Sequence, residues 1–202
     1  MKKKDKIDIF KNASPAQFRS FLTESDRGCV LILASVFDAK LKWLLETTIK
    51  TNLVGKGADK DFYKDLFGLN GALGSFSARL KIAFAFRLIT EDQFEAMEAL
   101  RYVRNKVAHL PFDFTLKDTE VRKVLKRITD LAAKIDHDKV RKLWGVTDQD
   151  EKFELVVAAF QIHLSMMIPT MEASVKLMQS RGINAAKGMQ QALDNLRRFD
   201  KE

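Results

Sequence analysis

The stretch TEDQFEAMEALRYVRNKVAH, residues 90–109, decides the fold of this chain. Thr90 followed three residues later by Gln93 forms a capping box, in which each side chain accepts a hydrogen bond from the backbone N–H of the other residue. A helix is therefore expected to begin there. Pro111 disfavours the α conformation in the residue before it, so this helix should end near His109. The stretch predicts one complete helix with a start signal and a stop signal.

Start signals of the same kind recur along the rest of the chain. Ser14-Pro15 can start a short helix, Asp26 can cap a long helix that is apolar nearly all round in its first half, and Ser75 can cap another. With 9 Gly and 3 Pro among 202 residues, the composition also favours helices over a sheet. We expect an all-α, multi-helix bundle with additional C-terminal helices, and helices over about 27–50, 59–67, 118–135, 139–143, 148–180 and 183–199.

Three parts are expected along the chain. Residues 1–13 should form a flexible basic arm, residues 14–180 a single all-α domain and residues 181–202 a C-terminal helical extension. Cys29 lies in an apolar run and is interpreted as a core residue, which leaves no partner for an internal disulfide. We find no secretory signal and no apolar run long enough to span a bilayer, so we expect a cytoplasmic protein without membrane contact.

The formal net charge of +8 is compatible with RNA or nonspecific DNA as a partner. The interval 117–127 contributes five basic residues against two acidic ones. We interpret it as a solvated face, and a phosphate-contacting face is the alternative. The three histidines are far apart in the sequence and no phosphate-binding loop is present, so neither a metal nor a cofactor is expected. The basic residues of the interval are Lys117, Arg122, Lys123, Lys126 and Arg127.

The end of the helix over 91–109 gathers the residues best suited to chemistry. Arg101, Asn105 and His109 follow one another at i, i+4 and i+8, so they share one stripe of the helix. Arg104 lies about 140° from His109 in an ideal helix. It can join the stripe only if the last turn is frayed.

These residue types suit the cleavage of RNA without a metal. His109 could act as general acid or base, Arg104 could bind a phosphate through two hydrogen bonds, and Asn105 could orient the imidazole. Together they would support the attack of a ribose 2′-hydroxyl on its own phosphodiester. The alternative is structural: His109 ends the helix, Asn105 makes a local hydrogen bond, and the arginines are solvated.

Arg104-Asn105-Lys106-Val107-Ala108-His109 resembles the R-x4-H motif of the HEPN superfamily. Two further segments narrow the resemblance. Residues 24–28, Glu-Ser-Asp-Arg-Gly, resemble the start of the mannitol operon repressor family, and so do residues 71–81 together with residues 88–94. The order and spacing agree with that family over residues 18–110. The resemblance implies an all-α homodimer that regulates transcription without an obvious DNA-reading motif.

Four polar residues lie beside strongly apolar helices, namely Glu24, Asp26, Arg27 and Arg79. Helix capping explains Asp26, and a buried pair of Glu24 or Asp26 with an arginine explains the others. The alternative is a binding cleft shared with the Arg104–His109 motif, and Arg101 would then belong to it.

Three functional hypotheses follow. The first is a transcriptional regulator that represses through protein partners. The second is a HEPN-type, metal-independent endoribonuclease that uses Arg104, Asn105 and His109. The third is a helical scaffold in which the motif is structural. We favour the first, because the longer resemblance points to it.

Overall fold

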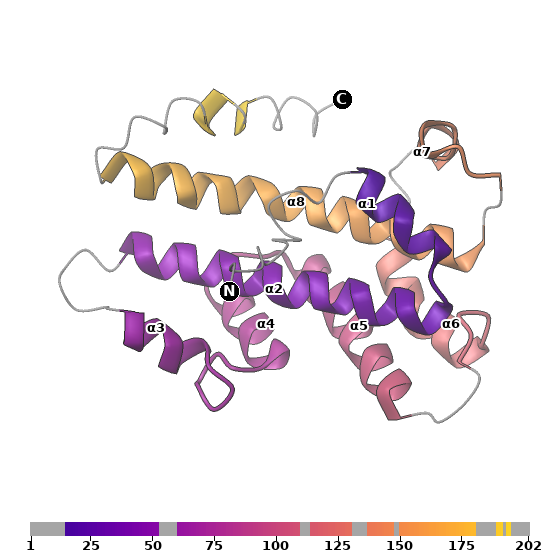
Figure 1. Cartoon of the computed structure of the whole chain (residues 1–202), viewed down its shortest axis with the longest axis horizontal. Helices are drawn as coiled ribbons and strands as arrows, with labels where there is room; N and C mark the ends of the chain where they lie inside the picture. Colours follow the sequence, from indigo (N-terminus) through magenta and orange to yellow (C-terminus); the bar gives the residue numbers. More distant parts are fainter. Residues whose placement is uncertain are drawn as a thin grey trace, which may run out of the picture. The chain divides into compact units, whose positions relative to one another are not determined.

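The computed structural model shows an all-helical protein (Figure 1). It confirms the predicted all-α class. The predicted arm over 1–13 and most of the predicted extension over 181–202 lie outside the residues that the structure describes. The described residues are 15–52, 60–109, 114–130, 137–147, 150–180, 189–191 and 193–194.

The helices follow the order of the sequence signals. The two longest, α2 and α8, have 27 and 30 residues. None of the described helices is both long enough and apolar enough to cross a membrane. The elements are α1 (Pro15–Ser20), η1 (Phe21–Thr23, a 3-10 turn), α2 (Asp26–Asn52), α3 (Lys60–Phe67), α4 (Phe76–Ala85), α5 (Glu91–His109), α6 (Thr119–Thr129), α7 (His137–Trp144) and α8 (Glu151–Ser180).

The chain forms two compact units, and neither is a continuous stretch of sequence. The first unit contains residues 1–39 and 95–161, and the second contains residues 40–94 and 162–202. Each boundary falls inside a helix, so that α2, α5 and α8 each begin in one unit and end in the other.

Aromatic rings fill the core of the first unit. Phe18 of α1 is fully buried, and its ring centroid lies 5.1 Å from that of Phe160 on α8. Trp144 of α7 contacts the same ring at 5.8 Å. Cys29 is buried as predicted, and burial raises the pKa of its thiol to about 12. Helices α1, α7 and α8 are therefore packed together through large aromatic side chains.

The helix caps confirm two predictions and correct one. Thr90 and Gln93 exchange both capping-box hydrogen bonds, at 3.0 and 3.2 Å, and the Ser75 hydroxyl accepts from the Ala78 N–H. The prediction that Asp26 caps α2 is wrong. The hydroxyl of Ser25 accepts from the Gly28 N–H at 3.0 Å, and the carboxylate of Asp26 turns away to other partners.

Helix α4 ends in a left-handed turn that carries an arginine. The Leu88 N–H donates to the Ala83 carbonyl, and the Arg87 N–H donates to the Phe84 carbonyl, which is the Schellman pattern. Arg87 has φ of +54°, a conformation in which glycine is the favoured residue.

A lysine is buried in the core of the second unit. Lys40 of α2 is 1% exposed, and its Nζ lies 4.8 Å from the centre of the Trp43 ring. No carboxylate within the described segments lies within ion-pair distance of it. Burial lowers the pKa of Lys40 to about 8. Burial, reinforced by the charge of Lys40, also lowers the pKa of His163 to about 3, so the imidazole is neutral near pH 7.

Replacing Lys40 by methionine should stabilise the protein by about 2 kcal/mol at pH 7, because the folded state no longer buries a charge. In the wild type the unfolded chain holds a proton between about pH 8 and pH 10.5 that the folded chain has lost. The free energy of unfolding should therefore rise with pH across that window, and the rise should vanish in Lys40→Met. Urea unfolding followed by circular dichroism measures both effects.

The matched control is Lys42→Met, two residues along the same helix and 43% exposed. It should change the stability by less than about 0.5 kcal/mol and leave the alkaline rise in place. Equal behaviour of the two variants would contradict the assignment of the rise to Lys40.

Candidate functional site

The C-terminal half of α5 presents an exposed surface that is basic and aromatic. Val103 and Val107 face the core, while the residues between them point outward. We call its exposed basic and aromatic residues the α5 surface; they are Tyr102, Arg104, Lys106 and His109. This half of the helix belongs to the first unit.

The basic side chains of the α5 surface form no ion pairs within the described residues, although the charges of Glu120 and Asp118 act on Lys106 from a longer distance. The Arg104 guanidinium donates to the Asn105 side-chain oxygen at 3.0 Å, and the Lys106 Nζ lies 5.0 Å from the centre of the Tyr102 ring. A hydrogen bond with Tyr102 raises the pKa of Lys106. Within the described part of the chain, no carboxylate forms an ion pair with Arg104, Lys106 or His109.

Arg101 differs from these residues because it is already paired. Its guanidinium donates two hydrogen bonds to Glu98, at 3.1 and 2.7 Å. These bonds raise the pKa of Arg101, which burial opposes. The predicted stripe of Arg101, Asn105 and His109 therefore contains one arginine that is committed to a local ion pair.

The backbone of α5 remains helical through His109. The frayed last turn that would bring Arg104 and His109 together is absent up to that residue. In a regular helix their side chains leave the axis about 140° apart. Arg104 contacts Asn105, whereas His109 is exposed and leaves the helix on a different side from Arg104.

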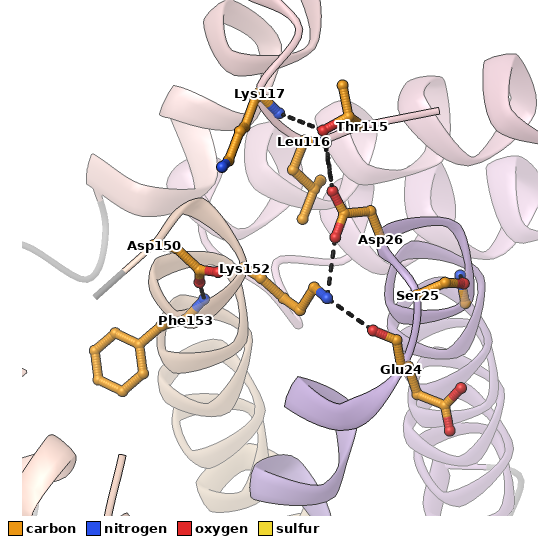
Figure 2. A network of polar contacts seen from close by, with 10 residues as sticks. Glu24, Ser25, Asp26, Thr115, Leu116, Lys117, Asp150, Lys152 and Phe153 are labelled. Carbon is orange, nitrogen blue, oxygen red and sulfur yellow. Dashed lines mark hydrogen bonds and ion pairs between the residues drawn. The ribbon is translucent and has the colours of Figure 1, made fainter. Parts of the chain in front are cut away.

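A polar network holds Thr115 and Leu116, which lie just before α6 (Figure 2). The Asp26 carboxylate accepts hydrogen bonds from the Leu116 N–H at 2.9 Å and from the Thr115 hydroxyl at 3.3 Å. Its other oxygen lies 3.0 Å from the Nζ of Lys152, which also donates to the Glu24 carbonyl at 2.7 Å. The network joins the starts of α2 and α8 to the residues just before α6.

The network keeps Asp26 ionised. Partial burial raises the pKa of Asp26, but the hydrogen bonds from Leu116, Lys152 and Thr115 and the charge of Lys152 outweigh burial. The pKa therefore lies below its ordinary value. Both side chains of the ion pair are well shielded, with exposures of 25% for Asp26 and 18% for Lys152.

Two other predicted binding residues flank this network. The Glu24 side chain is exposed, and it contributes only its backbone carbonyl to Lys152. Arg27 is half-buried in the first turn of α2. The expected pairing of Asp26 with an arginine is replaced by the ion pair with Lys152.

Arg79 lies in the second unit and contacts the turn before its own helix. Its Nε donates to the Leu73 carbonyl at 2.8 Å, and one terminal nitrogen donates to the Gly74 carbonyl at 3.0 Å. A Cβ on Gly71 in the same turn would lie 2.0 Å from the Asp65 carbonyl, so this turn requires glycine there. Arg79 and Gly71 both hold the turn in place.

The basic interval around α6 differs from the α5 surface, because acidic side chains accompany its charges. Lys123 pairs with Glu120, Lys126 pairs with Asp130, and Arg122 lies 3.6 Å from Glu151. This arrangement fits the interpretation as a solvated face. In the part of the chain described, no three histidine, cysteine or acidic side chains come together as a metal site would require.

Asp26→Asn should lower the free energy of unfolding by about 2 kcal/mol at pH 7, because Lys152 loses a shielded counter-charge and the hydrogen bonds weaken. The folded-state pKa of Asp26 is depressed, so its stabilising effect is complete above about pH 4 and is lost as the pH falls through the folded-state pKa. Wild type and variant should therefore converge in acid. Chemical unfolding at a series of pH values tests this.

Glu95→Gln removes one negative charge from an exposed position of α5 and serves as the control. It should leave the stability at pH 7 unchanged within about 0.5 kcal/mol. A loss as large as that of Asp26→Asn would mean that net charge, rather than the network, sets the difference.

No protein-family model and no curated protein matches the sequence. A solved structure does match: a chain of the X-ray structure of the MtlR–HPr complex from Escherichia coli is similar at a TM-score of 0.51 and 16% sequence identity. The likeness covers 77% of the present chain and 99% of that chain. At this identity the match establishes a shared architecture, and the present chain therefore has an MtlR-like, all-helical fold.

Proposed function

We propose that this chain is a regulator of transcription that represses by binding a partner protein. The observation that carries the proposal is the likeness to MtlR, which spans 99% of that chain. MtlR was solved in complex with another protein, HPr. The resemblance of residues 18–110 to the mannitol operon repressor family supports the same function independently of the fold.

The α5 surface is the part of the first unit best suited to such a contact. Arginine and tyrosine are enriched at protein interfaces, and their charge and ring are accessible at Arg104 and Tyr102. Basic side chains that form no ion pair within the described part of their own chain favour a partner with a complementary acidic patch. We therefore propose that the partner docks on the α5 surface through acidic residues, and that HPr is a candidate for it.

Reversing two charges of the α5 surface should weaken the complex. We expect Arg104→Glu/Lys106→Glu to raise the Kd for HPr at least about tenfold, because each reversal places like charges together. Isothermal titration calorimetry of the full chain with purified HPr measures the change. The affinity of the wild type should also fall as salt is raised.

The control is Lys123→Glu/Lys126→Glu, which makes the same change of net charge on α6. Its Kd should stay within about twofold of the wild type. If both double variants lose affinity equally, net charge and not the α5 surface is responsible. If the wild type does not bind HPr, then HPr is excluded as the partner.

A transcript comparison separates regulation from catalysis. Deletion of the gene should change the expression of a specific operon, and a copy that carries His109→Ala should restore it, because this variant keeps the charges of Arg104 and Lys106 through which the partner is proposed to bind. Arg104→Glu/Lys106→Glu should fail to restore it. An unchanged transcript profile on deletion would refute the regulatory function.

A HEPN-type ribonuclease is the second candidate. The observation that favours it is the exposure of Arg104 and His109 at one helix end, with Asn105 hydrogen-bonded to the arginine and, among the described residues, no acidic partner for either motif residue. Because these side chains leave the helix in different directions, one phosphate would have to be held by residues from two copies of the chain. His109 would then act as general acid or base, and Arg104 would bind the phosphate.

The ribonuclease proposal predicts that RNA is cleaved in the presence of a metal chelator. His109→Ala should slow the cleavage at least about a hundredfold, since general acid–base catalysis contributes about that much. His137→Ala, a histidine of α7, is the control and should retain the wild-type rate. Equal cleavage by wild type and His109→Ala would overturn the proposed catalytic role of His109.

A further inference from the structure

An exposed phenylalanine follows the last turn of α4 in the second unit. Phe86 is 67% exposed, although it lies in a chain that buries most of its large apolar side chains. Its neighbour Phe84 is 37% exposed on one side, and its ring stacks on Phe94 at 4.6 Å on the other. The ring of Phe86 is therefore an accessible apolar knob beside a fixed aromatic pair.

An open hollow of about 700 Å³ adjoins this knob. Phe84, Leu88 and Ile89 supply apolar walls, and the hydrogen bond from the Gln93 side chain to the Ser165 hydroxyl, at 2.7 Å, joins α5 to α8 in the lining. Ala85 and Arg87, on either side of Phe86 in the sequence, line the hollow, but Phe86 itself does not. Phe86 thus leaves the adjoining hollow of its own chain unfilled.

The hollow also carries two charges of opposite sign. Arg87 and Glu91 both line it, and both are exposed. In the described segments neither forms an ion pair with another side chain. The surface therefore contains an exposed phenylalanine, an apolar hollow, a cation and an anion. Within the described part of the chain, the phenylalanine does not fill the hollow and the two charges form no ion pair.

We propose that this surface binds a second copy of the same chain. In a two-fold symmetric contact, residue i of one copy meets residue j of the other, and j meets i. Phe86 of each copy would fill the hollow of its partner, and Arg87 of each copy would pair with Glu91 of the other. The surface carries both a phenylalanine and a hollow that can receive one, and both a cation and an anion. It is therefore more complementary to a second copy of itself than to a partner that carries charge of one sign.

The backbone at Arg87 supports this proposal. Arg87 occupies the left-handed position of the α4 turn, which glycine fills at lower cost. An arginine at that position projects a guanidinium from the turn beside the hollow. The strained residue and the complementary charges thus coincide on one surface.

A charge-swap experiment tests the pairing. Arg87→Glu alone places two carboxylates together at each cross-contact, and Glu91→Arg alone places two guanidinium groups together. We expect each variant to dimerise at least about tenfold more weakly than the wild type, by sedimentation velocity from about 1 to about 500 µM. When the two variants are mixed, they should form a heterodimer, because each of its two cross-contacts joins a carboxylate of the Arg87→Glu copy to a guanidinium of the Glu91→Arg copy.

Removal of the knob gives a second test. Phe86→Ser should abolish dimerisation while the circular dichroism spectrum stays unchanged. Leu69→Ser is the control, because Leu69 is 97% exposed in the same unit but lies outside the hollow, and this variant should dimerise like the wild type. Arg87→Gly should weaken the dimer while raising the melting temperature of the chain, because the turn is relieved.

The results separate the possibilities. A wild type that is monomeric over the whole concentration range overturns the proposal, and so does a dimer that survives Phe86→Ser. Failure of the two charge variants to associate with each other also overturns the pairing. None of these measurements includes HPr or RNA, so they stand or fall separately from the proposed function.

Discussion

The Asp26 carboxylate is the contact on which the arrangement of the first unit depends. It joins α2 to residues about 90 positions away in the sequence and, through Lys152, to the start of α8. An apolar contact could press these segments together, but it would not fix their direction. The carboxylate fixes it, because the Leu116 N–H, the Thr115 hydroxyl and the Lys152 ammonium each approach from a defined side. The residues just before α6 are thereby anchored to the start of α2.

Charge neutralisation distinguishes the α5 surface from the other basic parts of the first unit. The lysines of α6 have acidic partners three or four residues away, so the helix satisfies its own charges. Arg101 does the same with Glu98. Arg104 and Lys106 contact an amide and a phenol ring, and their charges remain available to a partner. Composition alone does not separate these two kinds of basic segment.

Local signals made much of the fold predictable. The caps formed by Thr90, Gln93 and Ser75 are predictable because each bond joins residues three positions apart. The apolar run around Cys29 likewise predicted a segment of the hydrophobic core. Asp26 was misread because Ser25, directly before it, is an equally good cap. Sequence order could not show which of the two turns outward.

The polar site was less predictable, because its partners are distant in sequence. Lys152 and the Glu24 carbonyl are 128 positions apart, and nothing near Lys152 distinguishes it from other lysines in a first helical turn. The same limit applies to Lys40, because the burial of its ammonium depends on contacts with helices that lie elsewhere in the sequence. The sequence shows the R-x4-H spacing, but the directions in which the Arg104 and His109 side chains leave the helix depend on whether the last turn of α5 is regular.

The interleaving of the two units has a consequence for how this chain can be divided. A cut between residues 94 and 95 would leave 1–94 with part of each unit and 95–202 with the remaining parts. Neither fragment would hold a complete core, but each would carry the surfaces that the other lacks. The two pieces should therefore be inert separately and should regain the fold only on association. That is the property required for fragment complementation, and it arises from three helices that each contribute to both cores.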